Sequence, residues 1–313
     1  MLESVIHGAA CPELEVHNFQ NAKERSQLDW RNFLLNSSFN DHRTRRTPPH
    51  RRRLSPWVAW QAGPLLCLLA IASGARAQDN YEIQVYGSET IPAHHTMLEF
   101  HTNFTAQGEK NVVDGVQPTY HALHETIEIT HGFTPWFETG FYIFTSARSG
   151  DGWDFVGSHL RPRVRVPESW HWPVGVSLSQ EIGYQRRGFS ADTWTWEIRP
   201  IIDKKMGPWY WSFNPAFDRS LHGANVHKGF EFAPNFKLSY DVTRKVAAGI
   251  EYYGSLGSIT GFDPLRDQQH AIFPTIDLDL APQWEVNFGA GIGMTGSTDR
   301  LVLKFIIGYR FDF

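Results

Sequence analysis

Three features are scarce in this 313-residue sequence, and each scarcity excludes a class of protein. Cysteine occurs only at Cys11 and Cys67, so the chain beyond them has no disulfide, no thiol nucleophile and no thiolate metal site. Long apolar runs are missing except near residue 60, which excludes a bundle of transmembrane helices. Basic residues are not in excess, since the net charge is −4, and this argues against binding to nucleic acid.

The N-terminal region carries a targeting pattern. Six arginines lie between Arg43 and Arg53, an apolar stretch runs from Trp57 to Ala72, and the triplet Ala75-Arg76-Ala77 follows. A charged region, a short apolar core and an A-x-A site are typical of a secretory signal peptide. We therefore predict a signal peptide over residues 51–77, cleaved after Ala77. A retained membrane anchor is the alternative.

Residues 1–50 precede this signal and show scattered polarity with no core of their own. They are interpreted as a disordered N-terminal extension or as the product of a start placed too far upstream. Without residues 1–77 the chain keeps 19 basic and 27 acidic residues and loses both cysteines. The exported chain is therefore acidic and free of thiols.

The last 13 residues, Leu301 to Phe313, alternate strictly between an apolar face and a more polar face. Such alternation predicts a strand, here slightly longer than the about 9–11 residues with which a tilted strand crosses a bilayer. The stretch resembles the closing strand of bacterial outer-membrane β-barrels. That resemblance implies that Phe311 and Phe313 form the signal read by the barrel-assembly machinery. A soluble sheet could end in the same way.

The same unit of alternating segment and turn recurs from residue 96 to the end. We predict an all-β fold, a transmembrane antiparallel up-and-down β-barrel of about 12 strands with both termini periplasmic. Residues 96–313 form the barrel, and residues 78–95 form an irregular periplasmic lead-in. The expected strands are residues 96–106, 120–131, 136–146, 155–166, 173–186, 193–202, 209–219, 229–241, 245–254, 270–280, 283–293 and 300–313.

One face of nearly every segment is aliphatic and aromatic. In residues 173–186, for example, Leu178 and Ile182 oppose Ser179 and Glu181. A soluble sandwich also alternates, but a core of this size would have difficulty burying so much apolar surface, whereas lipid accepts it. The pattern favours a membrane barrel.

The connections are predicted to alternate strictly in length, with short periplasmic turns and longer outer loops. Short connections are expected at residues 132–135, 204–208, 242–244 and 281–282. Longer ones are expected at residues 107–119, 147–154, 220–228 and 255–269.

Aromatic residues gather near the segment ends, where Trp and Tyr form girdles at the two membrane interfaces of barrels. Ordinary strand packing is the alternative, and prolines inside several segments count against ideal strands. The predicted girdle residues are Trp136, Trp194, Trp196, Trp209, Trp284 and Tyr309.

Charged residues collect on the other face, which we predict to line the lumen because a cation facing midplane lipid costs about 2–4 kcal/mol. The triplet Arg161, Arg163 and Arg165 resembles basic tracks in channels for acidic solutes. Acidic residues are as numerous on this face, however, so an internal ladder of salt bridges is the favoured interpretation. The predicted lumen-lining residues are Arg161, Arg163, Arg165, Glu181, Glu197, Arg199, Lys237, Glu251, Asp277, Glu285, Lys304 and Arg310, and Glu125, Glu138 and Asp279 are assigned to the same face.

Catalytic and metal signals are weak. His121 and His124, beside Glu125, would converge on a helix, but their spacing sends them to opposite faces of a strand. Ser158-His159 could suggest a lipid hydrolase, but adjacent strand residues point apart. The sequence therefore predicts no catalytic residue, no metal and no cofactor.

The chain from about residue 80 onward resembles porin-like outer-membrane barrels, including transporters associated with aromatic-degradation pathways. The resemblance rests on the repeated strand–turn unit, the turn Thr134-Pro135-Trp136 and the closing residues 309–313. It implies a location in the outer membrane, with lipid, the assembly machinery and a small solute as partners. The expected function is a narrow channel or passive transporter. A structural or surface-interaction barrel with a filled lumen is the alternative, and a lipid hydrolase is a lesser one.

Overall fold

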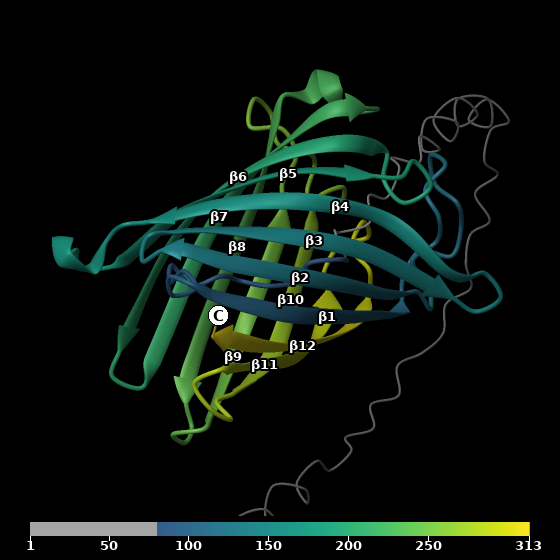
Figure 1. The fold of residues 1–313 in the computed structure, drawn as a ribbon. Coiled ribbons are helices and arrows are strands. Elements are labelled where there is room, and N and C mark those ends of the chain that lie inside the picture. Colours follow the sequence, from purple (N-terminus) through teal and green to yellow (C-terminus); the bar gives the residue numbers. More distant parts are fainter. Residues whose placement is uncertain (1–79, 313) are drawn as a thin grey trace, which may run out of the picture. The chain divides into compact units, whose positions relative to one another are not determined.

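The computed structural model describes residues 80–312, and the extension, the signal peptide and Phe313 lie outside them. Twelve antiparallel strands pair with their sequence neighbours, and β1 pairs with β12 to close a barrel (Figure 1). The prediction of an all-β barrel of 12 antiparallel strands is confirmed. The strands are β1 (His95–Gln107), β2 (Leu123–Thr134), β3 (Phe137–Arg148), β4 (Gly152–Arg165), β5 (Gly175–Gln185), β6 (Asp192–Met206), β7 (Trp209–Gly223), β8 (Phe230–Asp241), β9 (Val246–Ser255), β10 (Gln269–Leu278), β11 (Trp284–Gly293) and β12 (Leu301–Asp312).

The barrel wall is strongly tilted. In Figure 1 the blue and teal strands β1–β4 cross the green strands of the opposite wall at a steep angle, as expected when a sheet closes on itself. At the seam, His95 pairs with Asp312, so the first and last residues of the barrel lie at one rim. Two 3₁₀ turns, η1 (Glu168–Trp170) and η2 (Val226–Lys228), are the only helices among the described residues.

No helix within residues 80–312 is long and apolar enough to span a bilayer.

The two rims differ in their connections. The turn rim holds His95, Asp312 and residues 135–136, 166–174, 207–208, 242–245 and 279–283, whereas the loop rim holds residues 108–122, 149–151, 186–191, 224–229, 256–268 and 294–300. The predicted strict alternation of lengths is wrong at residues 149–151, a tight turn at the loop rim. Gly150 and Gly152 adopt positive φ there, which lets the β3–β4 pairing run on to the hairpin end. It is also wrong at residues 166–174, a long connection at the turn rim that contains η1.

The outer face of the wall is apolar. In β12, Leu303 and Phe305 are 45% and 40% exposed. Lys304, which lies between them, is 3% exposed, and Ile306, the next residue, is 1% exposed. Leu160 and Val164 of β4 alternate with buried Arg161 in the same way. Soluble proteins rarely expose an apolar surface that continues over so many neighbouring strands. Hydrocarbon is the solvent that such a surface requires.

The barrel interior is occupied by the chain itself. Residues 80–94, which we name the lumen segment, are extended, and Tyr81, Ile83 and Val85 are at most 6% exposed. The lead-in predicted outside the barrel therefore lies inside it. Its polar backbone can be buried because inward side chains of the wall supply hydrogen bonds.

Candidate functional site

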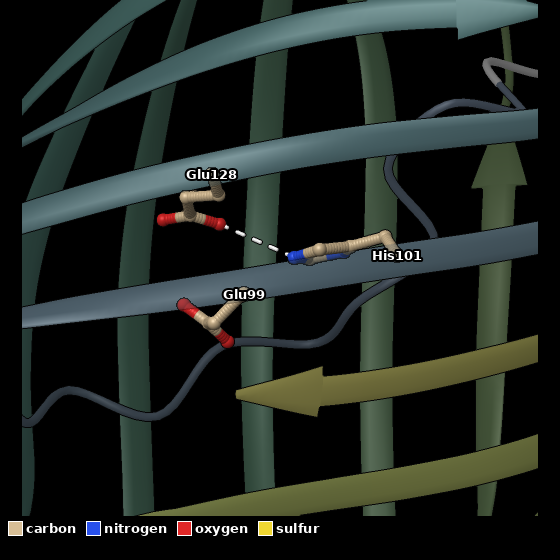
Figure 2. A group of neighbouring side chains, drawn as sticks. All are labelled: Glu99, His101 and Glu128. Carbon is tan, nitrogen blue, oxygen red and sulfur yellow. Dashed lines mark ion pairs between the residues drawn. The ribbon is translucent and has the colours of Figure 1, made fainter. Parts of the chain in front are cut away.

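The lumen segment runs the length of the barrel. At the loop rim, Asn80 donates from Nδ2 to Asp299 (2.8 Å) and accepts at its carbonyl from Asn103 (2.9 Å). At the turn rim, the His94 N–H donates to the Gly132 carbonyl (2.7 Å). The chain then reverses into β1. Figure 2 shows part of this blue coil beside β1, in front of the green strands of the opposite wall.

Alternate residues of the lumen segment pack into two apolar clusters on the inner wall. Tyr81 lies against β3, where its ring centroid is 5.5 Å from that of Phe144. Ile83 and Val85 pack against β9, β10 and β12. The buried wall residues of the clusters are Tyr142, Phe144, Val156, Tyr253, Ala271, Phe273 and Val302. The interior is thus partly a packed core. A filled lumen was the alternative prediction, but residues 80–94, which fill it, were predicted to be a periplasmic lead-in.

Wall side chains satisfy the backbone of the lumen segment. Asn214 of β7 accepts from the Tyr86 N–H (2.8 Å) and donates to the Tyr86 carbonyl (3.0 Å), and Ser212 also donates to that carbonyl (2.5 Å). Thr126 donates to the Tyr81 carbonyl (2.6 Å). These side chains replace the ladder bonds that a neighbouring strand would supply.

Tyr86 lies among three guanidinium groups. The guanidinium carbons of Arg161, Arg199 and Arg163 are 4.8, 5.2 and 5.6 Å from its ring centroid. Cations over an aromatic face are attracted by the ring quadrupole, more strongly when water is excluded. Its hydroxyl donates to Glu82, which lies 3.5 Å from Arg199. Tyr86 is therefore the polar anchor of the lumen segment.

The arginine triplet predicted from sequence is engaged in pairs. Arg161 contacts Glu128 (2.5 Å) and Glu138 (3.6 Å), and Arg163 contacts Glu138 (2.7 Å). Arg163 also donates to two carbonyls of the lumen segment, those of residues 87 and 89. Arg165 lies near the turn rim and pairs with Glu168 of η1 (3.1 Å). This arrangement matches the internal ladder of salt bridges that was favoured over a basic track.

A second ionic group lies on β8–β10 and β12. Lys237 contacts Glu251 (3.1 Å) and Asp277 (2.8 Å). Lys304 pairs with Glu251 and also donates to the Ile83 carbonyl of the lumen segment (3.1 Å). Four residues predicted separately along the sequence are thus brought together.

The remaining predicted lumen residues are more scattered. Glu181 pairs with buried His159, and Glu197 pairs with Arg199 at 2.6 Å. The carboxylate of Glu285 accepts from Gln84 at 3.0 Å. At the turn rim, the half-buried side chain of Arg310 donates to the Pro282 carbonyl at 2.8 Å.

Two residues assigned to the inner face lie elsewhere. Glu125 shares the outer face of β2 with Ile127 and accepts from Thr102 of β1 (2.8 Å) near the loop rim, where the lipid belt ends. Asp279 is exposed in the turn 279–283, because β10 ends at Leu278. The parity of β2 is set by exposed Ile129, which alternates with buried residues. That parity would have corrected the assignment.

Three inward residues of β1 and β2 were missed: Glu99, His101 and Glu128 are 6%, 0% and 0% exposed. The alternation of Leu98, Phe100 and Thr102 in the sequence was the available signal. His124 also points inward, whereas His121 is exposed outside the strands with a positive φ.

The serine–histidine pair considered for hydrolysis is divided by the wall. Ser158 pairs with outward Ile143, whereas the neighbouring His159 pairs with buried Tyr142 and contacts Glu181 inside the barrel. The two side chains therefore lie on opposite faces and form no dyad.

The predicted girdle residues lie near the rims. Trp284 packs on Tyr309 (centroids 4.8 Å apart) near the turn rim, where Trp209 and Trp136 are also exposed. Trp194 and Trp196 lie toward the loop rim, where Trp194 pairs with His222. Phe311 is exposed beside Tyr309 on the same outer face.

Two cavities lie at opposite ends of the lumen segment. One, of about 470 Å³, is at the loop rim and is lined by Glu109, Lys110, Tyr120 and Asp299. The other, of about 540 Å³, is at the turn rim and is lined by residues that include Glu99, Arg163 and Arg310. The turn-rim cavity is also lined by Gln84, Val85 and Tyr86 of the lumen segment, whereas Tyr81 and Ile83 line neither cavity.

Comparison with known proteins adds a family match. The model of a family described as "Putative MetA-pathway of phenol degradation" matches residues 168–311, from η1 to β12. Together with the closed wall and its apolar outer face, this decides the class. The protein is an outer-membrane β-barrel. No curated protein matches this outer-membrane barrel.

Solved structures resemble this outer-membrane barrel only distantly. A KdgM porin in complex with disordered oligogalacturonate is 11% identical, with 69% of this chain and 99% of that chain covered and a TM-score of 0.42. The Acinetobacter baumannii protein Omp33 is 11% identical, with 72% and 100% covered and a TM-score of 0.39. The translocator domain of NalP from Neisseria meningitidis is 10% identical, with 70% and 88% covered and a TM-score of 0.36. Similarities this distant say nothing about a solute.

Proposed function

We propose that this barrel conducts small solutes across the outer membrane along the path that the lumen segment occupies. The observation that carries the proposal is the pair of cavities at opposite rims of a barrel whose interior is filled by Tyr81, Ile83 and their wall contacts. The inner wall is rich in charged and hydroxyl side chains, as suits an aqueous path once the segment moves.

In this proposal the described state is the closed one. Tyr81, Ile83 and Val85 are buried against aromatic wall residues, and Tyr86 is bound among three arginines. A solute can pass only after these contacts break. The charges of Arg161 and Arg163 are offset by Glu128 and Glu138, so the proposal needs no anionic solute. The description of the matching family suggests a small aromatic solute.

The second candidate is a structural barrel whose lumen stays filled. The packed clusters around Phe144 and Phe273, both 0% exposed, favour it. The two candidates differ in whether the lumen segment leaves the wall, so the test must hold the segment in place.

A disulfide between residues 88 and 175 would hold the lumen segment against strand β5. A Cβ built on Gly175 of β5 lies 3.2 Å from the Ser88 Cβ, slightly below the about 3.5–4.5 Å between the Cβ atoms of a disulfide. It would also clash with Oδ1 of Asp203, so the Asp203 side chain must move to admit the cysteine. The chain beyond residue 67 has no cysteine, so the double variant S88C/G175C contributes one disulfide. Planar-bilayer recording of the purified protein then compares the oxidised and reduced variant.

Transport along this path predicts conductance for the native and reduced proteins and its loss on oxidation. The single variants S88C and G175C are the matched controls, because they cannot form the intramolecular disulfide. A silent native protein favours the structural barrel. Conductance that persists when mass spectrometry shows a complete disulfide contradicts the proposed path.

Export and assembly belong to the same proposal. A signal over residues 51–77, cleaved after Ala77, delivers the chain, and the exposed aromatic end of β12 at Phe311 engages the barrel-assembly machinery together with Phe313. Lipid then contacts the apolar belt, and Trp209, Trp284 and Tyr309 lie at one interface. By the usual arrangement of such barrels, the turn rim faces the periplasm.

A further inference from the structure

The β1–β2 hairpin carries a cluster of potential metal ligands on its inner face: Glu99, His101 and Glu128 (Figure 2). Glu99 and Glu128 are direct register partners, and His101 lies two residues further along β1 on the same face. One ligand atom from each residue lies within 4.8 Å of the others. Rigid paired strands, not a loop, hold the three side chains.

The cluster is buried, and each of its three residues has a polar atom that makes no hydrogen bond within residues 80–312. His101 is 0% exposed, and neither ring nitrogen makes a hydrogen bond within the described part of the chain. Its Nε2 lies 3.3 Å from Glu128 Oε2, the contact drawn in Figure 2. Glu99 is 6% exposed, and its Oε1 has no partner either. Buried polar atoms left unpaired are costly. His124 also has two unpaired ring nitrogens, but among the described residues such potential ligand atoms converge on one point only at Glu99, His101 and Glu128, which points to a group that they bind together.

The local charge also favours a cation. On the inner wall, Gly308 lies between Glu99 and Glu285, and a Cβ there would be 2.7 Å from Glu99 Cγ and 3.5 Å from Glu285 Cβ. Three carboxylates thus lie on neighbouring strands. Arg161 pairs with Glu128, but no Lys or Arg in residues 80–312 forms an ion pair with Glu99 or Glu285. A divalent ion would offset the remaining negative charge.

We propose that Glu99, His101 and Glu128 bind one divalent transition-metal ion, with Zn²⁺ the best match. Imidazole nitrogen and carboxylate oxygen are both zinc ligands, with bonds of about 2.0–2.2 Å, and three protein ligands leave the fourth position of a tetrahedral zinc ion open. Hard ions such as Mg²⁺ prefer oxygen ligands alone. The other oxygen of Glu128 accepts from Arg161 and Thr130, contacts that fix its orientation as supporting residues do at metal sites. Glu99 lines the cavity at the turn rim, which gives the ion an entry.

The test measures metal binding by the full barrel without an affinity tag. The protein, purified in detergent and treated with a chelator, is titrated with Zn²⁺, Co²⁺ and Mg²⁺ by calorimetry, and the bound metal is counted by mass spectrometry. We expect one Zn²⁺ per barrel, visible absorption bands with Co²⁺, and no comparable binding of Mg²⁺. His101→Gln and Glu99→Gln each weaken Zn²⁺ binding by more than the roughly 10–100-fold that loss of a supporting residue costs.

His124→Gln is the matched control, because His124 is a buried inward histidine of β2 outside the cluster and should leave Zn²⁺ binding unchanged. Heat-modifiable mobility on gels confirms that each variant is folded. The proposal is overturned if the folded native barrel binds no stoichiometric Zn²⁺, if H101Q binds it equally well, or if Mg²⁺ competes. If the native protein binds no metal and the E99Q variant is more stable than the native protein, the carboxyl groups of the cluster share a proton instead of a metal ion. None of these outcomes bears on conductance, which tests the transport proposal separately.

Discussion

Asn214 holds the centre of the lumen segment. Its side chain, 0% exposed on β7, forms two hydrogen bonds with the backbone of Tyr86, as a neighbouring strand would. Asn214→Ala removes both bonds and leaves the Tyr86 N–H buried without an acceptor, whereas the carbonyl keeps its bond from Ser212 at 2.5 Å. The substitution should therefore weaken the attachment of the lumen segment and leave the wall intact.

The size of the effect follows from the orphaned donor. Leaving one buried donor unpaired costs about 1–3 kcal/mol. Taking about 2 kcal/mol, the population with the segment detached rises by about 30-fold, since 1.4 kcal/mol is a factor of ten. In single-channel recordings of N214A, the open probability should rise by that order if detachment opens the path. The melting temperature of the barrel should also fall.

Ser177→Ala is the matched control. Ser177 is 2% exposed on the inner face of β5, and its hydroxyl has no hydrogen-bond partner among residues 80–312. S177A should change neither open probability nor melting. If folded N214A gates and melts as the native protein does, Asn214 does not hold the segment, and the reasoning about the closed state fails.

Two further outcomes test the membrane assignment. Phe305→Arg places a cation near the middle of the lipid-facing side of β12 and should destabilise the folded barrel by about 2–4 kcal/mol, measured as a lower folded fraction in lipid vesicles. The control Val112→Arg, in the exposed loop 108–122, should fold as the native protein does. Equal folding of both variants would show that Phe305 does not face lipid. The intact mass of the chain extracted from outer membranes should correspond to a start at Gln78, and a mass that retains residues 51–77 would contradict cleavage after Ala77.

The wall was predictable because a strand in lipid has a strict period of two. In β12 the predicted lipid face, including Leu303 and Phe305, is the exposed face, and the register with β1 follows. The strand number also followed, since each of the expected ranges overlaps one strand. Glu125 was assigned to the wrong face, although it alternates with Thr126 and shares its face with the outward Ile127 of β2.

The sequence did not predict that the lumen segment fills the barrel. Alternation shows which residues of a segment share a face, but it does not show whether that face contacts lipid, the barrel wall or water. Tyr81, Ile83 and Val85 alternate with Glu82 and Gln84 as strand residues do. An additional strand would make the number odd and open the ring of antiparallel pairs, which was the available sign that these residues lie off the wall. Their contacts come from side chains of distant strands, and no local pattern encodes such contacts. For the same reason, sequence gave the charges of the inner wall but not their pairing.

The course of the lumen segment has a consequence for biogenesis. The segment reaches the loop rim at Asn80 and enters β1 at the turn rim, and the chain continues before residue 80. With cleavage after Ala77, only Gln78 and Asp79 precede Asn80, so threading the segment into a finished barrel would mean moving its own end from one rim to the other between close-packed side chains. Laying it along the nascent sheet before β1 meets β12 avoids this passage, so we expect the segment to pack before the seam closes.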